Sequence, residues 1–315
     1  MEFDFLRALA ICYIIGVRHL DDYASQFFLS KLDTTLAYIF LGLFVYISGF
    51  LLLKNNSYLI DSKQKIWVFF KKRFFRIYPL YIFALLLFLV NHFMDFRSFI
   101  YHIFLLNLFL NKSVLTLWFI SLICFYYFLF PIFVYKYNKL KIVLLSLFIC
   151  LGLFIINLIS GLIDIRLIIY LPLFIFGIIT AKNNEVLDIL KKKINIFIFF
   201  IVCIFSACLY FYNNNFQYLF IMIFMLSSVP PLLFLGEEFI KKVKYYKIII
   251  NLSYASYCMY LFHRVVFYLL LKIYHPKTDI FILVYLGFIG LPLIYLLAKK
   301  AQSAYDLVFL RLVNV

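Results

Sequence analysis

The stretch FDFLRALAICYIIGVRHL, residues 3–20, sets the frame for the rest of the chain. It is apolar and long enough, at about 1.5 Å per residue, to cross a bilayer as one helix. Charged and imidazole side chains occur only near its ends, with Arg7 towards one end and His19 at the other, roughly 18 Å apart along the axis. Ionisable groups are costly inside a spanning helix and usually face a protein interior. Arg7 and His19 are therefore candidates for function, although anchoring at the two membrane surfaces explains them about equally well.

The composition identifies the class of protein. The chain has 315 residues, of which 67% are hydrophobic and 14% charged, and its mean hydropathy is +1.04. Soluble domains are about 45–50% apolar, so this composition indicates a polytopic membrane protein whose main partner is the lipid bilayer. The net charge of +16 is better explained by Lys and Arg in cytoplasmic loops than by binding to nucleic acid, which we do not expect. The six cysteines form no CxxC pair, so we expect neither a metal site nor a disulfide framework.

The apolar segments predict an all-α bundle with about ten membrane-spanning helices in a single domain, residues 1–315. The segments are 3–20, 34–53, 75–94, 99–110, 114–135, 141–160, 166–181, 194–212, 216–236, 252–273 and 279–298. The segment near 99–110 is too short to span comfortably. If it does not cross, the Lys-rich loops fall on the cytoplasmic side, as the positive-inside rule requires. This topology places both termini in the cytoplasm, Arg7 at the inner face and His19 at the outer face.

A pair of arginines lies at the end of the most basic predicted loop, residues 54–76. Arg73 and Arg76 in RFFRIYPLY are three residues apart and share one face at the predicted start of the third span. Pro79 is expected in the first turns of that helix, where its missing N–H costs least. Paired arginines at a helix start suit the phosphates of a nucleotide-like donor. Ordinary anchoring is the alternative, because this motif alone is weak.

The last-but-one apolar segment carries a polar stripe in NLSYASYCMYLFHRVVFYLL. Ser253, Tyr257, Tyr260 and Arg264 recur at helical spacing on an otherwise apolar helix, and His263 lies beside them. Such a stripe is expected to face the bundle interior.

Taken in order, FDFLRALAICYIIGVRH, RFFRIYPLY, LWFISLICFYYFLFP and SYASYCMYLFH resemble the membrane acyltransferase-3 family. The resemblance implies a ten-span enzyme that moves an acyl group, commonly acetyl from acetyl-CoA, onto a hydroxyl of a glycan or other acceptor. It implies that Arg7 and His19 are the Arg/His pair of the first helix, and that Arg73 and Arg76 are the paired arginines. Tyr81 completes the motif of the third helix, and the Trp-to-Pro helix is represented by Trp118, Tyr127 and Pro131.

Two positions depart from the family pattern. The family usually has ten residues between the Arg and the His, whereas this chain has eleven, and Arg18 occupies the expected His position. On an ideal helix His19 is turned by about 100° from Arg18. A π-bulge near Gly16 would return His19 to the inner face, and whether Arg18 or His19 faces the interior depends on it. Many members also carry an acidic residue where this chain has Ile123 and Cys124.

The resulting hypothesis is an acyl-CoA-dependent O-acyltransferase of the bacterial inner membrane, with acyl-CoA as co-substrate and no tightly bound cofactor. Arginines would bind the donor phosphates, and His19 would act as general base on a hydroxyl of an extracytoplasmic or lipid-linked glycan. Asp21 or Asp22 is a candidate to orient His19. The candidates for lining a tunnel between the two ends are Arg18, Trp118, Tyr257, Tyr260, His263 and Arg264. A transporter or flippase of a polysaccharide intermediate is the alternative, and it predicts inverted repeats, which the sequence does not show.

Overall fold

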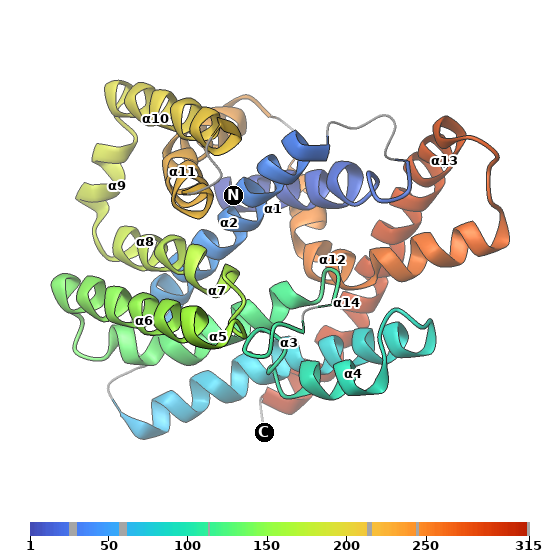
Figure 1. Cartoon of the computed structure of the whole chain (residues 1–315), viewed down its shortest axis with the longest axis horizontal. Helices are drawn as coiled ribbons and strands as arrows, with labels where there is room; N and C mark the ends of the chain where they lie inside the picture. Colours follow the sequence, from blue (N-terminus) through green and yellow to red (C-terminus); the bar gives the residue numbers. More distant parts are fainter. Residues whose placement is uncertain (25–29, 57–61, 113, 213–215, 244–245, 314–315) are drawn as a thin grey trace.

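The computed structural model describes residues 1–24, 30–56, 62–112, 114–212, 216–243 and 246–313, and every regular element in these ranges is a helix (Figure 1). Two of the elements, η1 and η3, are π-helices. In chain order the elements are α1 (Glu2–Tyr13), η1 (Ile14–Arg18), α2 (Ser30–Asn56), α3 (Lys63–Val90), α4 (Phe96–Ile103), α5 (Trp118–Val134), α6 (Lys139–Ser160), α7 (Arg166–Ile169), α8 (Leu171–Lys182), α9 (Asn184–Leu190), α10 (Lys193–Tyr212), α11 (Gln217–Lys242), α12 (Lys247–Ile273), α13 (Asp279–Tyr285), η3 (Leu286–Gly290) and α14 (Leu291–Val313).

The predicted all-α polytopic bundle is confirmed. Within the described residues, 7 helical segments are long and apolar enough to cross a membrane. They are 32–55, 63–90, 139–160, 193–212, 217–242, 247–273 and 279–309. The other three predicted spans are short or broken helices: α1 continues into η1, α5 has 17 residues, and α7 and α8 divide the segment 166–181 between them. The total of about ten crossings stays a prediction.

The segment near 99–110 forms a helix too short to cross. Helix α4 has 8 residues, and turns follow it up to the start of α5. Asp95 begins the helix by accepting a hydrogen bond from the Ser98 amide at 3.0 Å. The Tyr78 hydroxyl of α3 donates to the carbonyl of Ile103, so the end of α4 is attached to the side of α3.

The long helix α2 and the shorter helix α8 pack with their backbones in close contact. A Cβ atom on Gly177 would lie 2.2 Å from the Tyr46 carbonyl oxygen, and one on Gly49 would lie 2.3 Å from that of Phe174. Only glycine fits at such positions, as at other close helix crossings in membranes. Helices α6 and α10 instead expose most of their apolar side chains, and Figure 1 shows α10 beside α11 at the edge of the bundle.

The third span begins earlier than the sequence predicts. Helix α3 starts at Lys63, so much of the predicted loop 54–76 is helical, while residues 57–61 lie outside the described residues. The expectation that Pro79 lies in the first turns is therefore wrong, because it sits inside α3. A proline there leaves the carbonyl four residues earlier, that of Phe75, without its helical donor. The Tyr305 hydroxyl of α14 donates to this carbonyl, so a distant helix compensates for the proline.

Candidate active site

The π-helix η1 determines where His19 lies. Its wider turn is closed by the His19 amide, which donates to the Ile14 carbonyl at 2.9 Å, five residues back. One residue is thereby added to the turn without breaking the helix. A π-bulge near Gly16, the condition on which the orientation of His19 depended, is present, and it directs His19 towards α12. There the His19 ring stacks on His263, with ring centroids 4.6 Å apart and planes 5° from parallel.

The second ring of this pair is held by its own helix. His263 is fully buried, and its Nδ1 lies 2.8 Å from the Tyr260 carbonyl oxygen. A carbonyl can only accept, so in the neutral ring Nδ1 carries the proton and Nε2 the lone pair. Nε2 of His263 and Nδ1 of His19 are both buried without a hydrogen-bond partner in the described part of the chain. Each ring of the pair therefore has one nitrogen atom whose hydrogen-bonding capacity is not used by the described residues.

Charged groups surround the pair on the side where α1 and η1 end. Asp22 accepts from Arg264 of α12 and from Arg18 at 3.2 Å, so one carboxylate joins the first helix to the second half of the bundle. Arg264 is 9% exposed and depends on Asp22 for a counter-charge. Asp21 lies 3.5 Å from Arg18, and burial raises the pKa of the Asp21 carboxyl while Arg18 opposes this. The structure thus gives Asp22 a part in fixing α12.

A cavity of about 540 Å³ lies on the other side of Tyr260 from these histidines. Its walls come from α1, α2, α3, α5, α12 and α14, and its lining along α12 extends from Ile250 to Tyr260, roughly 15 Å. Arg7, Arg73 and Arg76 all line it, although 66 positions separate Arg7 from Arg73. The three arginines therefore converge on one pocket. We call this space the arginine cavity.

The three guanidinium groups have no ion pair with any described carboxylate. Arg7, Arg73 and Arg76 are close enough for their charges to repel one another. Nε of Arg73 is buried and unpartnered, and the guanidinium lies over the rings of Phe69 and Tyr127 at 5.7 and 5.9 Å. Asp4 and Asp306 line the same cavity without pairing directly with these arginines. A cluster of three guanidinium groups outside any direct ion pair is suited to a phosphate-bearing ligand.

Aromatic side chains close the opposite end of the arginine cavity. The Tyr260 ring lies between the cavity and the histidine pair, with centroid distances of 6.5 Å to His19 and 6.0 Å to His263. Phe119 of α5 packs edge-on against Tyr260 at 5.6 Å. The Tyr260 hydroxyl is held by the Thr116 carbonyl at 2.7 Å. Tyr260 and Phe119 are thus the side chains that a molecule in the cavity meets before the histidines.

The polar stripe of α12 faces inwards as predicted. Ser253, Tyr257 and Tyr260 line the arginine cavity, whereas Arg264 lies one step further along, paired with Asp22. The Tyr257 hydroxyl donates to the Ile77 carbonyl at 2.8 Å, which ties α12 to α3.

Four of the six predicted tunnel residues do not line the arginine cavity: His263 and Arg264, described above, and Arg18 and Trp118. Arg18 pairs with Asp21 and Asp22, and it does not line the arginine cavity. Trp118 does not line it either, because its ring is covered by the Arg166 guanidinium at 3.8 Å.

The structure also shows cavity residues that the sequence-based reasoning missed. Asp4 lines the arginine cavity and accepts from Ser253 at 2.9 Å. Gln302 and Asp306 of α14 line it as well, joined by a 2.9 Å hydrogen bond. The last apolar segment was expected to end at 298, but α14 continues to Val313. The one-turn spacing of Gln302 and Asp306 was the sequence signal that the helix continues with a polar face.

A family model described as an acyltransferase domain, that of the membrane acyltransferase-3 family, matches residues 2–299. The chain belongs to this family. The match covers nearly the whole bundle, including η1, both histidines and all three arginines. The membrane acyltransferase gave no match in a comparison with curated proteins, and none in a comparison with solved structures.

Proposed function

We propose that this membrane acyltransferase transfers an acyl group, with acetyl the first candidate, from acyl-CoA to a hydroxyl of an extracytoplasmic or lipid-linked glycan. One observation carries the proposal. A single cavity has three unpaired arginines in its lining at one end and, at the other, the tyrosine that covers a stacked histidine pair. Family membership favours acyl transfer over the transport of a polysaccharide intermediate.

The arginine end fits the donor. CoA carries several phosphate charges, and guanidinium groups bind phosphate oxygens in a planar, bidentate way. The lining between Arg73 and Tyr260 is largely apolar and aromatic, with Ile77, Ile123 and Tyr257 among its side chains. An extended pantetheine arm suits such a passage, because the arm is narrow and carries only a few polar groups. Its thioester would then lie beside Tyr260 and the histidine pair.

The histidine end supplies the base. His19 removes the proton of the acceptor hydroxyl while the oxygen attacks the thioester carbonyl. The C–S bond breaks, the acyl group stays on the acceptor oxygen as an ester, and the CoA thiolate takes up the proton. His263 positions His19 by stacking against it. The His263 ring is itself held by the hydrogen bond from its Nδ1 to the backbone. Because the donor is cytoplasmic and His19 lies at the predicted outer face, the acceptor approaches from outside.

The test uses membranes that contain the full chain, labelled acetyl-CoA and cell-surface polysaccharide. We expect base-labile label on the polysaccharide with the parent protein, and loss of transfer by about 10²- to 10⁴-fold with His19→Ala. Donor binding by purified His19→Ala should be retained. His275→Ala, at an exposed histidine between α12 and α13, is the matched control and should transfer normally. Full transfer by His19→Ala would exclude the base role, and no transfer by the parent would exclude the proposed acceptor and donor.

A further inference from the structure

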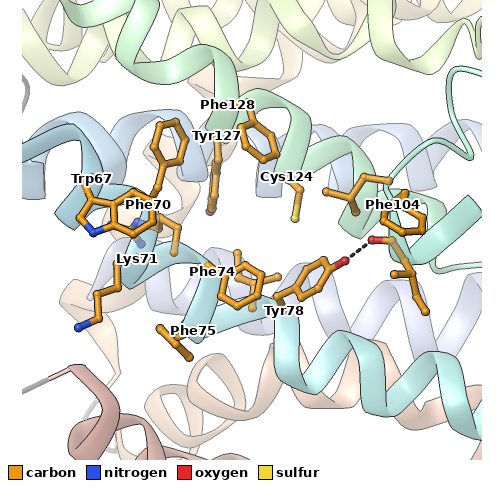
Figure 2. Close-up of a pocket in the computed structure, with 14 residues that line it drawn as sticks. Trp67, Phe70, Lys71, Phe74, Phe75, Tyr78, Phe104, Cys124, Tyr127 and Phe128 are labelled. Carbon is orange, nitrogen blue, oxygen red and sulfur yellow. Dashed lines mark hydrogen bonds between the residues drawn. The ribbon is translucent and has the colours of Figure 1, made fainter. Parts of the chain in front are cut away.

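A second cavity, of about 850 Å³, lies between α3, α5 and the end of α4 (Figure 2). We call it the lateral groove. Arg73, Ile77 and Tyr127 line both this groove and the arginine cavity, so their side chains form the partition between the two. The lateral groove plays no part in the acyl transfer proposed above.

The walls of the lateral groove are almost entirely apolar. Figure 2 shows rings of α3, including Phe70 and Phe74, opposite Tyr127 and Phe128 of α5. The Tyr78 hydroxyl is already used, since it donates to the Ile103 carbonyl. A sugar would find few hydrogen-bonding groups here, whereas a hydrocarbon chain needs none.

The groove opens towards the surroundings of the bundle. Phe74, Phe104 and Phe128 are 50%, 65% and 56% exposed. Phe74 lies inside α3, Phe128 inside α5 and Phe104 at the end of α4, and exposed rings on the apolar surface of a bundle that spans a bilayer face lipid. The groove is therefore accessible to a lipid chain directly from the membrane.

One end of the groove is positively charged and has the character of a membrane interface. Trp67 and Lys71 lie together at this end, and Phe104 lies at the other (Figure 2). Trp is enriched at membrane surfaces, and Lys near an anionic leaflet attracts its headgroups. Arg73 adds a second cation from the partition, with Nε buried and unpartnered among the described residues. A hydrocarbon groove that ends in two cations fits an amphiphile with a negative head.

We propose that the lateral groove binds one anionic phospholipid of the inner leaflet. One acyl chain lies between α3 and α5, and the phosphate contacts Lys71 and the groove side of Arg73. Because Arg73 also lines the arginine cavity, the lipid headgroup sits next to the site proposed for the donor and neutralises part of its charge. The headgroup thus shares Arg73 with the proposed donor site, whereas the acyl-chain groove is separate from the proposed route of acyl transfer, so the lipid site is tested by lipid binding in the absence of acyl-CoA.

The test uses Trp67 as the reporter. The chain has 2 tryptophans, so Trp118→Phe leaves Trp67 as the single fluorophore. The full chain is reconstituted in phosphatidylcholine with a small fraction of brominated phosphatidylglycerol or brominated phosphatidylcholine. We expect the anionic lipid to quench Trp67 with about a fivefold higher apparent affinity.

Two variants test the two parts of the site. Lys71→Gln should remove most of the preference for the anionic lipid, and Cys124→Phe should lower it by filling the groove. Lys139→Gln and Leu147→Phe, which change exposed residues of α6, are the matched controls and should keep the preference. Equal quenching by both lipids in the parent background would overturn the proposal. So would a preference that survives in both groove variants, or one that soluble adenosine 3′,5′-bisphosphate abolishes, since a nucleotide would then be the occupant.

Discussion

His19 and His263 lie face to face, with ring centroids 4.6 Å apart and planes 5° from parallel, although 244 positions separate them in the sequence. Two stacked imidazolium ions would repel each other, and Arg264 follows His263 directly. At least one ring of the pair therefore stays neutral and can accept a proton. This suits a general base that works beside the covering ring of Tyr260.

His263→Phe tests whether the second ring positions the first. Phenylalanine keeps an aromatic ring against His19 but removes the Nδ1 hydrogen bond to the Tyr260 carbonyl. Loss of a positioning bond of this kind is worth about 1 kcal/mol, so we expect kcat to fall by roughly fivefold. KM for acyl-CoA should not change, because His263 does not line the arginine cavity. Unchanged kcat would assign His263 a packing role alone, and rescue of kcat by His263→Asn, whose amide can replace the Nδ1 donor, would support positioning.

Arg73→Lys and Arg76→Lys separate phosphate binding from membrane anchoring. Lysine keeps the charge but not the planar pair of donors, so we expect acyl-CoA affinity to fall by about tenfold in each variant. Lys72→Gln is the control: it removes a charge from an exposed neighbour that does not line the arginine cavity. Anchoring predicts the opposite pattern, because the positive-inside rule counts Lys and Arg alike. Isothermal titration of purified protein with a non-hydrolysable acyl-CoA analogue gives the affinities.

The sequence predicted the local features of this site better than the contacts between helices. The extra residue between Arg7 and His19, counted against the family pattern, pointed to a π-bulge as one of two possibilities, because a one-residue insertion in a helix has few structural solutions. The inward stripe of α12 was also predictable from local sequence, because helical periodicity alone determines which residues share a face.

The pairing of Asp22 with Arg264 was not predictable in this way. It joins residues 242 positions apart, and only the packing of α12 against α1 brings them together. The start of α3 and the interior position of Pro79 escaped prediction because the compensating donor, Tyr305, comes from a different helix. The lining of the cavity by α14 was missed because hydropathy falls there before the helix ends.

Asp22→Asn tests the link between the first helix and α12. The substitution leaves Arg264, which is 9% exposed, without its counter-charge. Arg264 is buried but Asp22 is exposed, so the expected loss of about 1–3 kcal/mol lies between that of a surface ion pair and that of a buried one. Thermal unfolding in detergent should show the loss. Asp188→Asn, at an exposed carboxylate of α9, should leave stability unchanged, and an equal effect of both variants would contradict the prediction.

Gly177→Ala tests the contact between α2 and α8. The added methyl would meet the Tyr46 carbonyl oxygen at 2.2 Å, so the helices must separate. Overpacking of this kind costs about 1–3 kcal/mol, measured as a lower unfolding free energy in detergent. Gly152→Ala in α6 is matched, because its methyl would have no atom within 4 Å and alanine favours a helix. An unfolding free energy of Gly177→Ala equal to or above that of the parent would show that α2 and α8 can separate without loss of stability.

Tyr305→Phe, combined with Pro79→Ala, tests whether α14 compensates for the proline inside α3. In the parent the Tyr305 hydroxyl donates to the Phe75 carbonyl, which Pro79 deprives of a helical donor. Removing the hydroxyl should therefore cost about 1–3 kcal/mol of unfolding free energy, because the carbonyl is left without a donor. In the Pro79→Ala background the alanine amide can donate a hydrogen bond to the Phe75 carbonyl, so Tyr305→Phe should cost markedly less. A double-mutant cycle measured by unfolding in detergent gives the coupling between the two sites. Equal costs in both backgrounds would mean that the hydroxyl stabilises α14 independently of the proline.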